Sequence, residues 1–154
     1  MISKKKFFLG LILVLLSACS NEFESDPNNW EYVTTANNGA QAYLDLNRLE
    51  CEDTMCKAWT KLEFPKPKKM SEERFHDSKN PQINLASKRI DSMRYYYCYS
   101  KRSMMTSYQL YDAKGELINT KWVNKPEMEI VKKNTLEYDL FQRACKPLLE
   151  EKSE

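Results

Sequence analysis

Histidine is nearly absent from this 154-residue sequence, which contains only His76. A Ser-His-Asp or Cys-His arrangement would need that one imidazole as its base, and His76 lies in a polar stretch between prolines, where a solvated loop residue is expected. The sequence also lacks a phosphate-binding glycine loop and a metal-binding helix motif. We therefore expect no enzyme, no catalytic residues, no metal and no cofactor.

The sequence also lacks an apolar run long enough to span a membrane as a helix. The run Phe7–Leu16 has about ten residues, against the roughly twenty that such a helix needs. Basic residues Lys4–Lys6 precede it, and the small residues Ser17 and Ala18 follow it. This layout is typical of a secretion signal, so residues 1–18 are predicted to be a signal peptide.

The segment Leu16-Ser17-Ala18-Cys19 resembles the lipobox of bacterial lipoproteins. The resemblance implies acylation of the Cys19 thiol, cleavage before it and acylation of the new amine, and several acyl chains anchor a protein stably. Ser20 is not aspartate, which favours an outer-membrane location. The alternative is an ordinary signal peptide in which Cys19 is incidental. Residues 19–29 are polar and are predicted to be a flexible tether.

A clear excess of charge is missing as well. Removing residues 1–18 removes three lysines and no acid, which changes the formal net charge from +2 to −1. Nucleic acid is therefore not an expected partner, because its binding rests on an excess of positive charge. The rest of the chain suits one domain with its own core, predicted at residues 30–147 with a frayed tail at 148–154.

Apart from the lipobox cysteine, the chain keeps Cys51, Cys56, Cys98 and Cys145. An even number of cysteines in an exported protein favours disulfides. Zinc is the competing interpretation, but two of the cysteines are isolated and the single histidine is near none of them. Of the three pairings, Cys51–Cys56 with Cys98–Cys145 is favoured, since the first two residues can close a short turn.

Alternating apolar and polar residues predict an antiparallel sheet of about six strands with a C-terminal helix packed on it, an α+β fold stapled by disulfides. The predicted strands are 30–35, 40–46, 57–64, 88–100, 103–111 and 116–123. Asn38-Gly39 predicts a tight hairpin turn with positive φ at both residues, and Gly115 predicts a second hairpin. Residues 65–87, with three prolines, are predicted to be a long loop.

The helix is predicted from a capping box at Asn134 and Glu137. Leu136, Leu140, Phe141 and Ala144 or Cys145 then recur at helical spacing. Docking of that face on the sheet would bring Cys145 to Cys98, and Pro147 is expected to end the helix.

Two groups of side chains are candidates for ligand binding. The basic group could hold a sulfated glycan or an acidic protein by charge; it contains Lys66, Lys68, Lys69, Lys88 and Arg89. The aromatic group could form a recognition surface; it contains Trp59, Tyr95 and Tyr97. A solvated lysine-rich loop and structural cross-strand aromatic pairs are the alternatives.

A series of short motifs in this order resembles the bacterial surface-adhesin protein E family. The motifs are Trp30-Glu31-Tyr32-Val33, Tyr43-Leu44-Asp45, Lys57-Ala58-Trp59, Cys98, the segment Tyr108–Gly115, Trp122 and Cys145. The resemblance implies a sheet with a C-terminal helix and a tether to the outer membrane. It also implies that the protein can form homodimers. It also implies adhesion to host vitronectin, laminin, plasminogen or heparin-like chains.

Two functions follow as hypotheses. The first is a lipid-anchored adhesin that binds host matrix or serum proteins or a glycosaminoglycan. The second is a periplasm-facing lipoprotein that inhibits a wall-degrading enzyme or serves as an envelope accessory.

We expect Cys19→Ala to abolish lipid anchoring, because the acylated thiol is lost. Detergent phase partitioning of labelled cells measures this: the unchanged protein enters the detergent phase, and the variant stays in the aqueous phase. Cys19→Ala protein that still partitions into detergent would rule out the lipobox.

Overall fold

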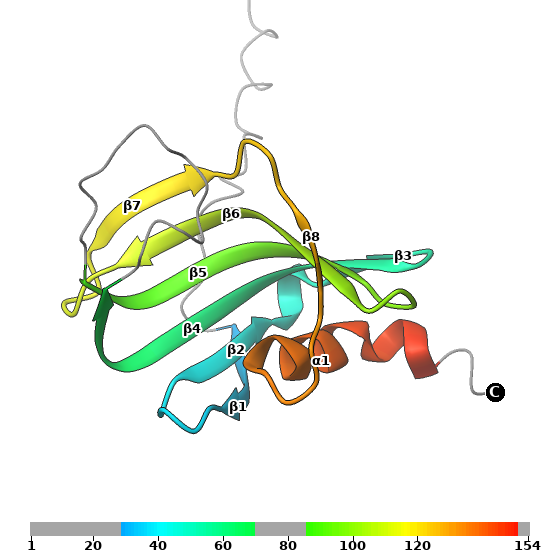
Figure 1. Ribbon diagram of the computed structural model, residues 1–154, viewed down its shortest axis with the longest axis horizontal. Coiled ribbons are helices and arrows are strands. Elements are labelled where there is room, and N and C mark those ends of the chain that lie inside the picture. The colour runs from blue at the N-terminus through cyan, green and yellow to red at the C-terminus, as the bar shows by residue number, and fades with distance from the viewer. Residues whose placement is uncertain (1–28, 70–85, 151–154) are drawn as a thin grey trace, which may run out of the picture.

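The structure is a computed structural model that describes residues 29–69 and 86–150. Its elements in chain order are β1 (Trp30–Thr35), β2 (Gln41–Asp45), the 3₁₀ turn η1 (Leu46–Arg48), β3 (Glu50–Glu52), β4 (Met55–Lys69), β5 (Ala86–Tyr97), β6 (Arg102–Tyr111), β7 (Leu117–Trp122), β8 (Met128–Ile130) and α1 (Leu136–Glu150). The strands form one antiparallel sheet in the order β1-β2-β4-β5-β6-β7, with β3 added to β4 and β8 to β6. With α1 at the C-terminal end (Figure 1), the predicted fold class is confirmed.

The described part of the chain has eight strands where the sequence predicted about six. The two additional strands, β3 and β8, have three residues each. Such strands are too short for alternation to be visible in the sequence.

The predicted loop at 65–87 is wrong at both ends. Strand β4 continues to Lys69 and β5 begins at Ala86, and the two strands pair again at Lys68↔Ser87. Pro65 and Pro67 fall where the register shifts between Glu63 and Lys68, because a strand tolerates proline where ladder hydrogen bonds are interrupted. Residues 70–85 lie outside the described residues.

Both predicted hairpins are present, but the first turn differs from the expected one. Gly39 has φ 81°, whereas Asn38 is not among the residues with positive φ. The Gly39 N–H donates to the Ala36 carbonyl at 2.8 Å, and the Ala36 N–H donates to the Ala40 carbonyl. Only glycine therefore needs the left-handed conformation, as in three-residue hairpin loops. Gly115 closes the second hairpin in the same way, with φ 83° and its N–H donating to Asp112.

The N-cap of α1 lies one residue after the predicted Asn134, and Tyr138 stands where a capping box would need Glu or Gln. The hydroxyl of Thr135 accepts the Tyr138 N–H at 3.1 Å, so Thr135 caps the helix. Asn134 instead has a left-handed φ of 62°. The helix also continues through Pro147, which was expected to end it, as far as Glu150.

The last turn of α1 is held by packing and by one hydrogen bond. Leu148 and Leu149 pack against the core, and the Tyr99 hydroxyl donates to the Leu148 carbonyl at 3.1 Å. These contacts compensate for the amide hydrogen bond that proline removes. The predicted frayed tail is therefore helical over 148–150, and 151–154 lie outside the described residues.

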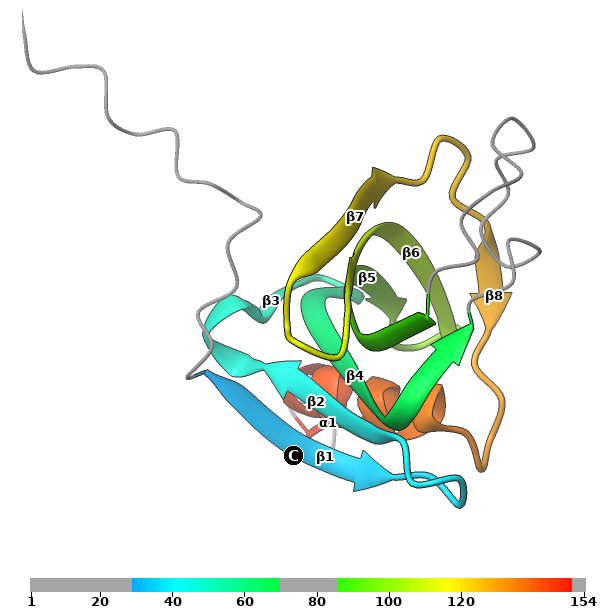
Figure 2. The same cartoon turned by 90° about the vertical axis from the view of Figure 1, so that its left-hand side faces the viewer.

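The apolar side of α1 packs on one face of the strongly curled sheet (Figure 2), here called the helix face. Leu140, Phe141 and Ala144 are 0–1% exposed, and they join sheet residues such as Leu44 and Tyr96 in one core cluster. The Tyr96 and Phe141 rings meet edge to face, with centroids 6.1 Å apart. Burial, with the charge of Glu137, raises the pKa of Tyr96 well above 10, so its phenol stays neutral.

Polar and covalent contacts join α1 to three parts of the sheet. Cys98 and Cys145 form a disulfide that links the end of β5 to α1. Arg143 donates to both carboxylate oxygens of Glu31 on β1, at 2.6 and 3.0 Å, and Arg94 on β5 donates to Glu137 at 3.1 Å. No helix of the described residues has the length and apolarity to cross a membrane.

Candidate interaction surface

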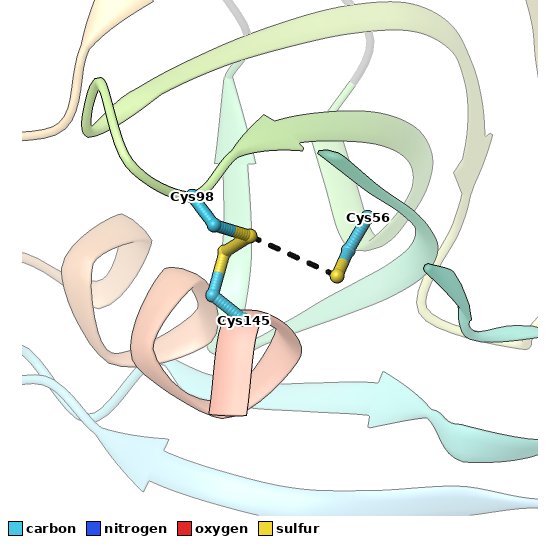
Figure 3. Close-up of side chains that lie close together, drawn as sticks. All are labelled: Cys56, Cys98 and Cys145. Atoms are coloured by element: carbon cyan, nitrogen blue, oxygen red, sulfur yellow. Dashed lines mark hydrogen bonds between the residues drawn. A yellow bond between two sulfur atoms is a disulfide. The ribbon is translucent and has the colours of Figure 1, made fainter. Parts of the chain in front are cut away.

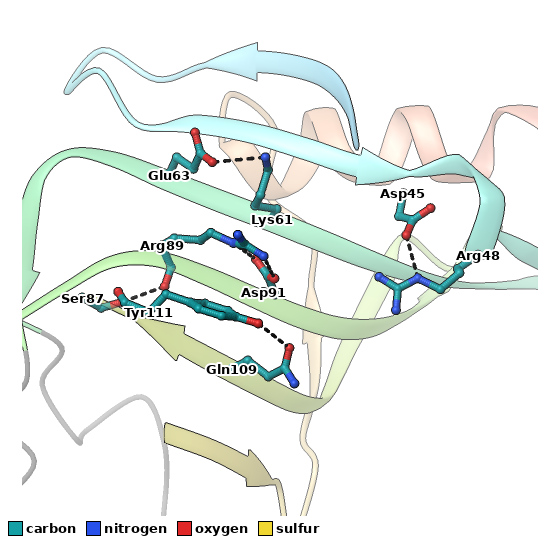
Figure 4. Close-up of polar contacts among 9 residues, drawn as sticks. All are labelled: Asp45, Arg48, Lys61, Glu63, Ser87, Arg89, Asp91, Gln109 and Tyr111. Carbon is teal, nitrogen blue, oxygen red and sulfur yellow. Dashed lines mark hydrogen bonds and ion pairs between the residues drawn. The ribbon is translucent and has the colours of Figure 1, made fainter. Parts of the chain in front are cut away.

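Strand alternation places a second set of side chains on the face of the sheet away from α1, here called the open face. On β4 the helix face takes Ala58 and Thr60, and the open face takes Trp59 and Lys61. Aromatic and charged residues dominate the open face across β2, β4, β5 and β6: Tyr43, Trp59, Lys61, Glu63, Arg89, Asp91, Tyr95, Tyr97 and Tyr111. These include four of the eight residues that the sequence proposed for binding: Trp59, Arg89, Tyr95 and Tyr97. Figure 4 shows Arg89 with its polar contacts on this face.

Trp59 is buried, which corrects the prediction that its ring forms a binding surface. It is 4% exposed, and the Arg48 guanidinium lies over its ring, 4.8 Å from the centroid. Asp45, itself 1% exposed, holds Arg48 through a 2.6 Å contact from Nε to Oδ2. Because Arg48 comes from the η1 turn, alternation along β4 gave no sign of this cover.

Lys61 is also engaged in contacts within the open face. Its ammonium lies 4.0 Å from the Tyr43 ring centroid and 5.4 Å from that of Trp30, and 3.1 Å from the Glu63 carboxylate. Partial burial, with the charge of Glu63, raises the pKa of Tyr43. Tyr43 therefore stays neutral at physiological pH, and the aromatic rings here serve as supports for cations of the protein itself.

Arg89 was predicted to bind a ligand, but its charge is used inside the protein. Its guanidinium makes two contacts with Asp91, which is fully buried, including a 2.8 Å bond from Nε to Oδ1. It also lies over the Tyr111 ring, 4.2 Å from the centroid. The hydrogen bond to Asp91 raises the pKa of Arg89. We assign Arg89 a structural role, because Asp91 would otherwise be a buried charge without its main partner.

The remaining predicted lysines gather at the end of the sheet where β4 and β5 pair across the proline-containing irregularity. Lys66 and Lys68 are exposed, and Lys68 Nζ lies 5.6 Å from the Phe64 ring centroid. The Lys88 ammonium donates to the Pro65 carbonyl at 2.6 Å and lies at the surface. We call Lys66, Lys68 and Lys88 the basic end. The Lys69 side chain lies outside the described part of the molecule.

Tyr95 and Tyr97 lie at the opposite end of β5 and are half-buried. They stand across from Lys57 and Met55 of β4. The structure therefore does not bring these two tyrosines together with the basic end into one patch.

An exposed apolar edge was missed by the sequence reasoning. Four side chains of β7 and β8 are 44–67% exposed: Leu117, Trp122, Met128 and Ile130. Both strands pair only with β6 among the described strands. Alternation could not identify these residues, since it does not show which strands lie at an edge.

One group of potential metal ligands occurs among residues 29–69 and 86–150. The sulfur atoms of Cys56, Cys98 and Cys145 lie within 4.8 Å of one another. All three belong to the two predicted disulfides, Cys51–Cys56 and Cys98–Cys145, which are both present. Metal binding by cysteine requires the thiolate, so this oxidised group is not a metal centre.

We predict that Arg89→Met lowers the free energy of unfolding by about 3 kcal/mol, because it leaves Asp91 buried without its ion pair. Lys88→Met on the same strand should cost under about 0.5 kcal/mol, as expected for a surface position. Urea denaturation of both variants measures the difference. Equal midpoints for the two would contradict the structural role of Arg89.

Comparison with solved structures supports the fold. A crystal form of Haemophilus influenzae protein E matches with a TM-score of 0.54 and 12% identity, over 80% of this chain and 91% of that one. Protein E from non-typeable Haemophilus influenzae matches with a TM-score of 0.51 and 14% identity, over 77% and 78%. At such identities the likeness establishes the fold. Among curated proteins no significant match is found.

The amino-acid sequence was also compared with models of protein families. The model of the surface-adhesin protein E family matches residues 30–146, nearly the whole described domain. The matched range also includes the motifs on which the resemblance rested. The chain therefore belongs to the surface-adhesin protein E family.

Proposed function

We propose that the protein is a lipid-anchored outer-membrane adhesin that binds sulfated glycosaminoglycan, or host proteins that carry similar anionic surfaces, through the basic end. Family membership supports an adhesin-type role at the cell surface. The observation that carries the ligand assignment is the exposure of Lys66 and Lys68 beside Lys88 at one end of the sheet. The anchor is the acylated Cys19.

The contacts of the cationic side chains favour the basic end, and not the open face, as the site for an anionic ligand. Arg48, Lys61 and Arg89 each contact a carboxylate, at Asp45, Glu63 and Asp91. An anionic ligand would have to displace these partners. At the basic end the Lys88 ammonium contacts the neutral Pro65 carbonyl, and this contact does not cancel its charge.

Lysine suits a sulfated chain because its ammonium is a compact charge on a flexible stem. Such binding relies on long-range attraction and few shaped contacts, and salt screens it over about 8 Å at physiological ionic strength. The proposal therefore requires affinity for heparin to fall steeply as salt concentration rises.

We predict that replacing Lys66, Lys68 and Lys88 together with glutamine weakens heparin binding about tenfold at physiological salt. Three surface charge contacts of about 0.5 kcal/mol each sum to about 1.5 kcal/mol, and every 1.4 kcal/mol is tenfold in affinity. Surface plasmon resonance on immobilised heparin measures the dissociation constants.

The matched control replaces Lys101, Lys132 and Lys133 with glutamine, which removes the same charge from exposed positions elsewhere. Lys101 lies in the turn at the opposite end of β5. Equal losses in the two triple variants would show that net charge, and not the basic end, governs binding. Unchanged binding in the first variant would remove the basic end from the proposal.

Orientation is tested separately by protease treatment of intact cells. An adhesin must be cleaved while the outer membrane is closed. Protein that is cleaved only after the membrane is opened would instead support the periplasm-facing accessory or inhibitor.

A further inference from the structure

The Cys51–Cys56 and Cys98–Cys145 disulfides lie against each other where β4, the end of β5 and α1 meet. Figure 3 shows Cys56 of the first disulfide beside the complete Cys98–Cys145 bridge. Cys56 Sγ is 3.7 Å from Cys98 Sγ. Neither sulfur carries a hydrogen, so this distance is a van der Waals contact between two S–S bonds. The fold produces the contact because Cys56 pairs with Tyr96 across β4 and β5, and Cys98 follows two residues later. The Cys98 N–H also donates to the Thr54 carbonyl at 2.9 Å, which fixes the end of β5 beside the β3–β4 turn.

The four sulfur-bearing residues differ sharply in exposure. Cys56, Cys98 and Cys145 are 0–1% exposed. Cys51 on β3 is partly exposed, and its sulfur contacts the Ala144 carbonyl oxygen, 3.7 Å away, outside the close group of three sulfurs. Thiol–disulfide exchange depends on access to the attacked sulfur, so Cys51, the one partly exposed residue of the four, is the expected point of attack for an external thiolate.

We propose that the cluster is a thiol–disulfide exchange site whose substrate is a small external thiol. The exchange replaces the Cys98–Cys145 disulfide, which holds α1, by a Cys56–Cys98 disulfide within the sheet. In the first step the external thiolate attacks Cys51 Sγ. A mixed disulfide forms on Cys51, the Cys51–Cys56 bond breaks, and Cys56 leaves as a thiolate.

In the second step the released Cys56 thiolate attacks Cys98 Sγ. A Cys56–Cys98 bond forms, the Cys98–Cys145 bond breaks, and Cys145 leaves as a thiolate that takes up the proton lost by the external thiol. One thiol enters and one thiol remains, so no oxidant or reductant is needed. Because Cys145 Sγ is also within 4.8 Å of Cys56 Sγ, the Cys56 side chain must rotate to approach along the S–S axis.

The exchange changes which elements are covalently joined. Before it, Cys98–Cys145 ties β5 to α1. Afterwards, Cys56–Cys98 joins two parts of the sheet that are already paired, and α1 keeps its packing, its ion pairs and its hydrogen bond from Tyr99, but loses its covalent tie to β5. A thiol acting at the surface of β3 thereby loosens the helix on the other side of the cluster.

Two single variants separate this route from nonspecific reduction. Cys51→Ala leaves Cys56 as a free thiol beside the second disulfide, and Cys56→Ala leaves Cys51 free but outside the close group. Each full-length variant is incubated at about pH 8, quenched with acid, alkylated and digested with trypsin. Cleavage after Lys57, Arg94 and Arg143 separates the cysteines of β3–β4, β5 and α1 into three peptides.

We expect Cys51→Ala to give peptides linked through Cys56 and Cys98, with alkylated Cys145, at a fraction independent of protein concentration. Cys56→Ala should retain the Cys98–Cys145 link and be alkylated at Cys51 alone. Alkylation of Cys56 alone in the Cys51→Ala variant, with the Cys98–Cys145 link intact, would overturn the proposal.

The unmutated protein provides a second test that does not depend on the folding of either variant. Equimolar glutathione should produce protein that carries glutathione on Cys51, a Cys56–Cys98 link and a free Cys145. Glutathione on Cys51 together with a free Cys56 and an intact Cys98–Cys145 bridge would contradict the second step. Glutathione found first on Cys98 or Cys145 would contradict the route through Cys51.

Discussion

The docking of α1 on the sheet is the interaction on which the rest of the domain depends. A helix of fifteen residues is marginal in water by itself, so α1 requires the sheet. The sheet in turn requires α1, because Leu140 and Phe141 complete the core around Tyr96. The Cys98–Cys145 bridge adds a covalent tie and closes a ring that spans β6, β7 and β8. In the loop-entropy view, a ring of this size stabilises the fold by about 4 kcal/mol.

The open face stabilises the fold in a different way. Its cations lie over aromatic rings and pair with carboxylates, as Arg89 does with Tyr111 and Asp91. This arrangement covers polar groups on the central strands, and it leaves few charges on that face for a partner. This distribution of charge supports our proposal that the protein binds its ligand at the basic end of the sheet.

Much of this was predictable from local pattern. Alternation identified the main strands, the spacing of Leu140 and Phe141 identified the buried side of the helix, and the cysteine count led to both bridges. The cover over Trp59 was not predictable, because Arg48 reaches it from a separate turn. The Arg89–Asp91 pair could have been found, since residues two apart in a strand share a face. The C-terminal end of the helix was predicted too early, at Pro147. The contacts of Leu148 and Leu149 with the core and the Tyr99 hydrogen bond outweigh the loss of the amide hydrogen bond at proline.

Native-state hydrogen exchange tests the central claim most directly. If α1 and the sheet form one cooperative unit, amides of 140–146 and of the central strands β4 and β5 should open together, with the same free energy and the same denaturant dependence. Replacing Cys98 and Cys145 with alanine should lower the protection of both regions by the same amount. Fast exchange of 140–146 while β4 and β5 stay protected would contradict the account, since the sheet would then be stable without its helix.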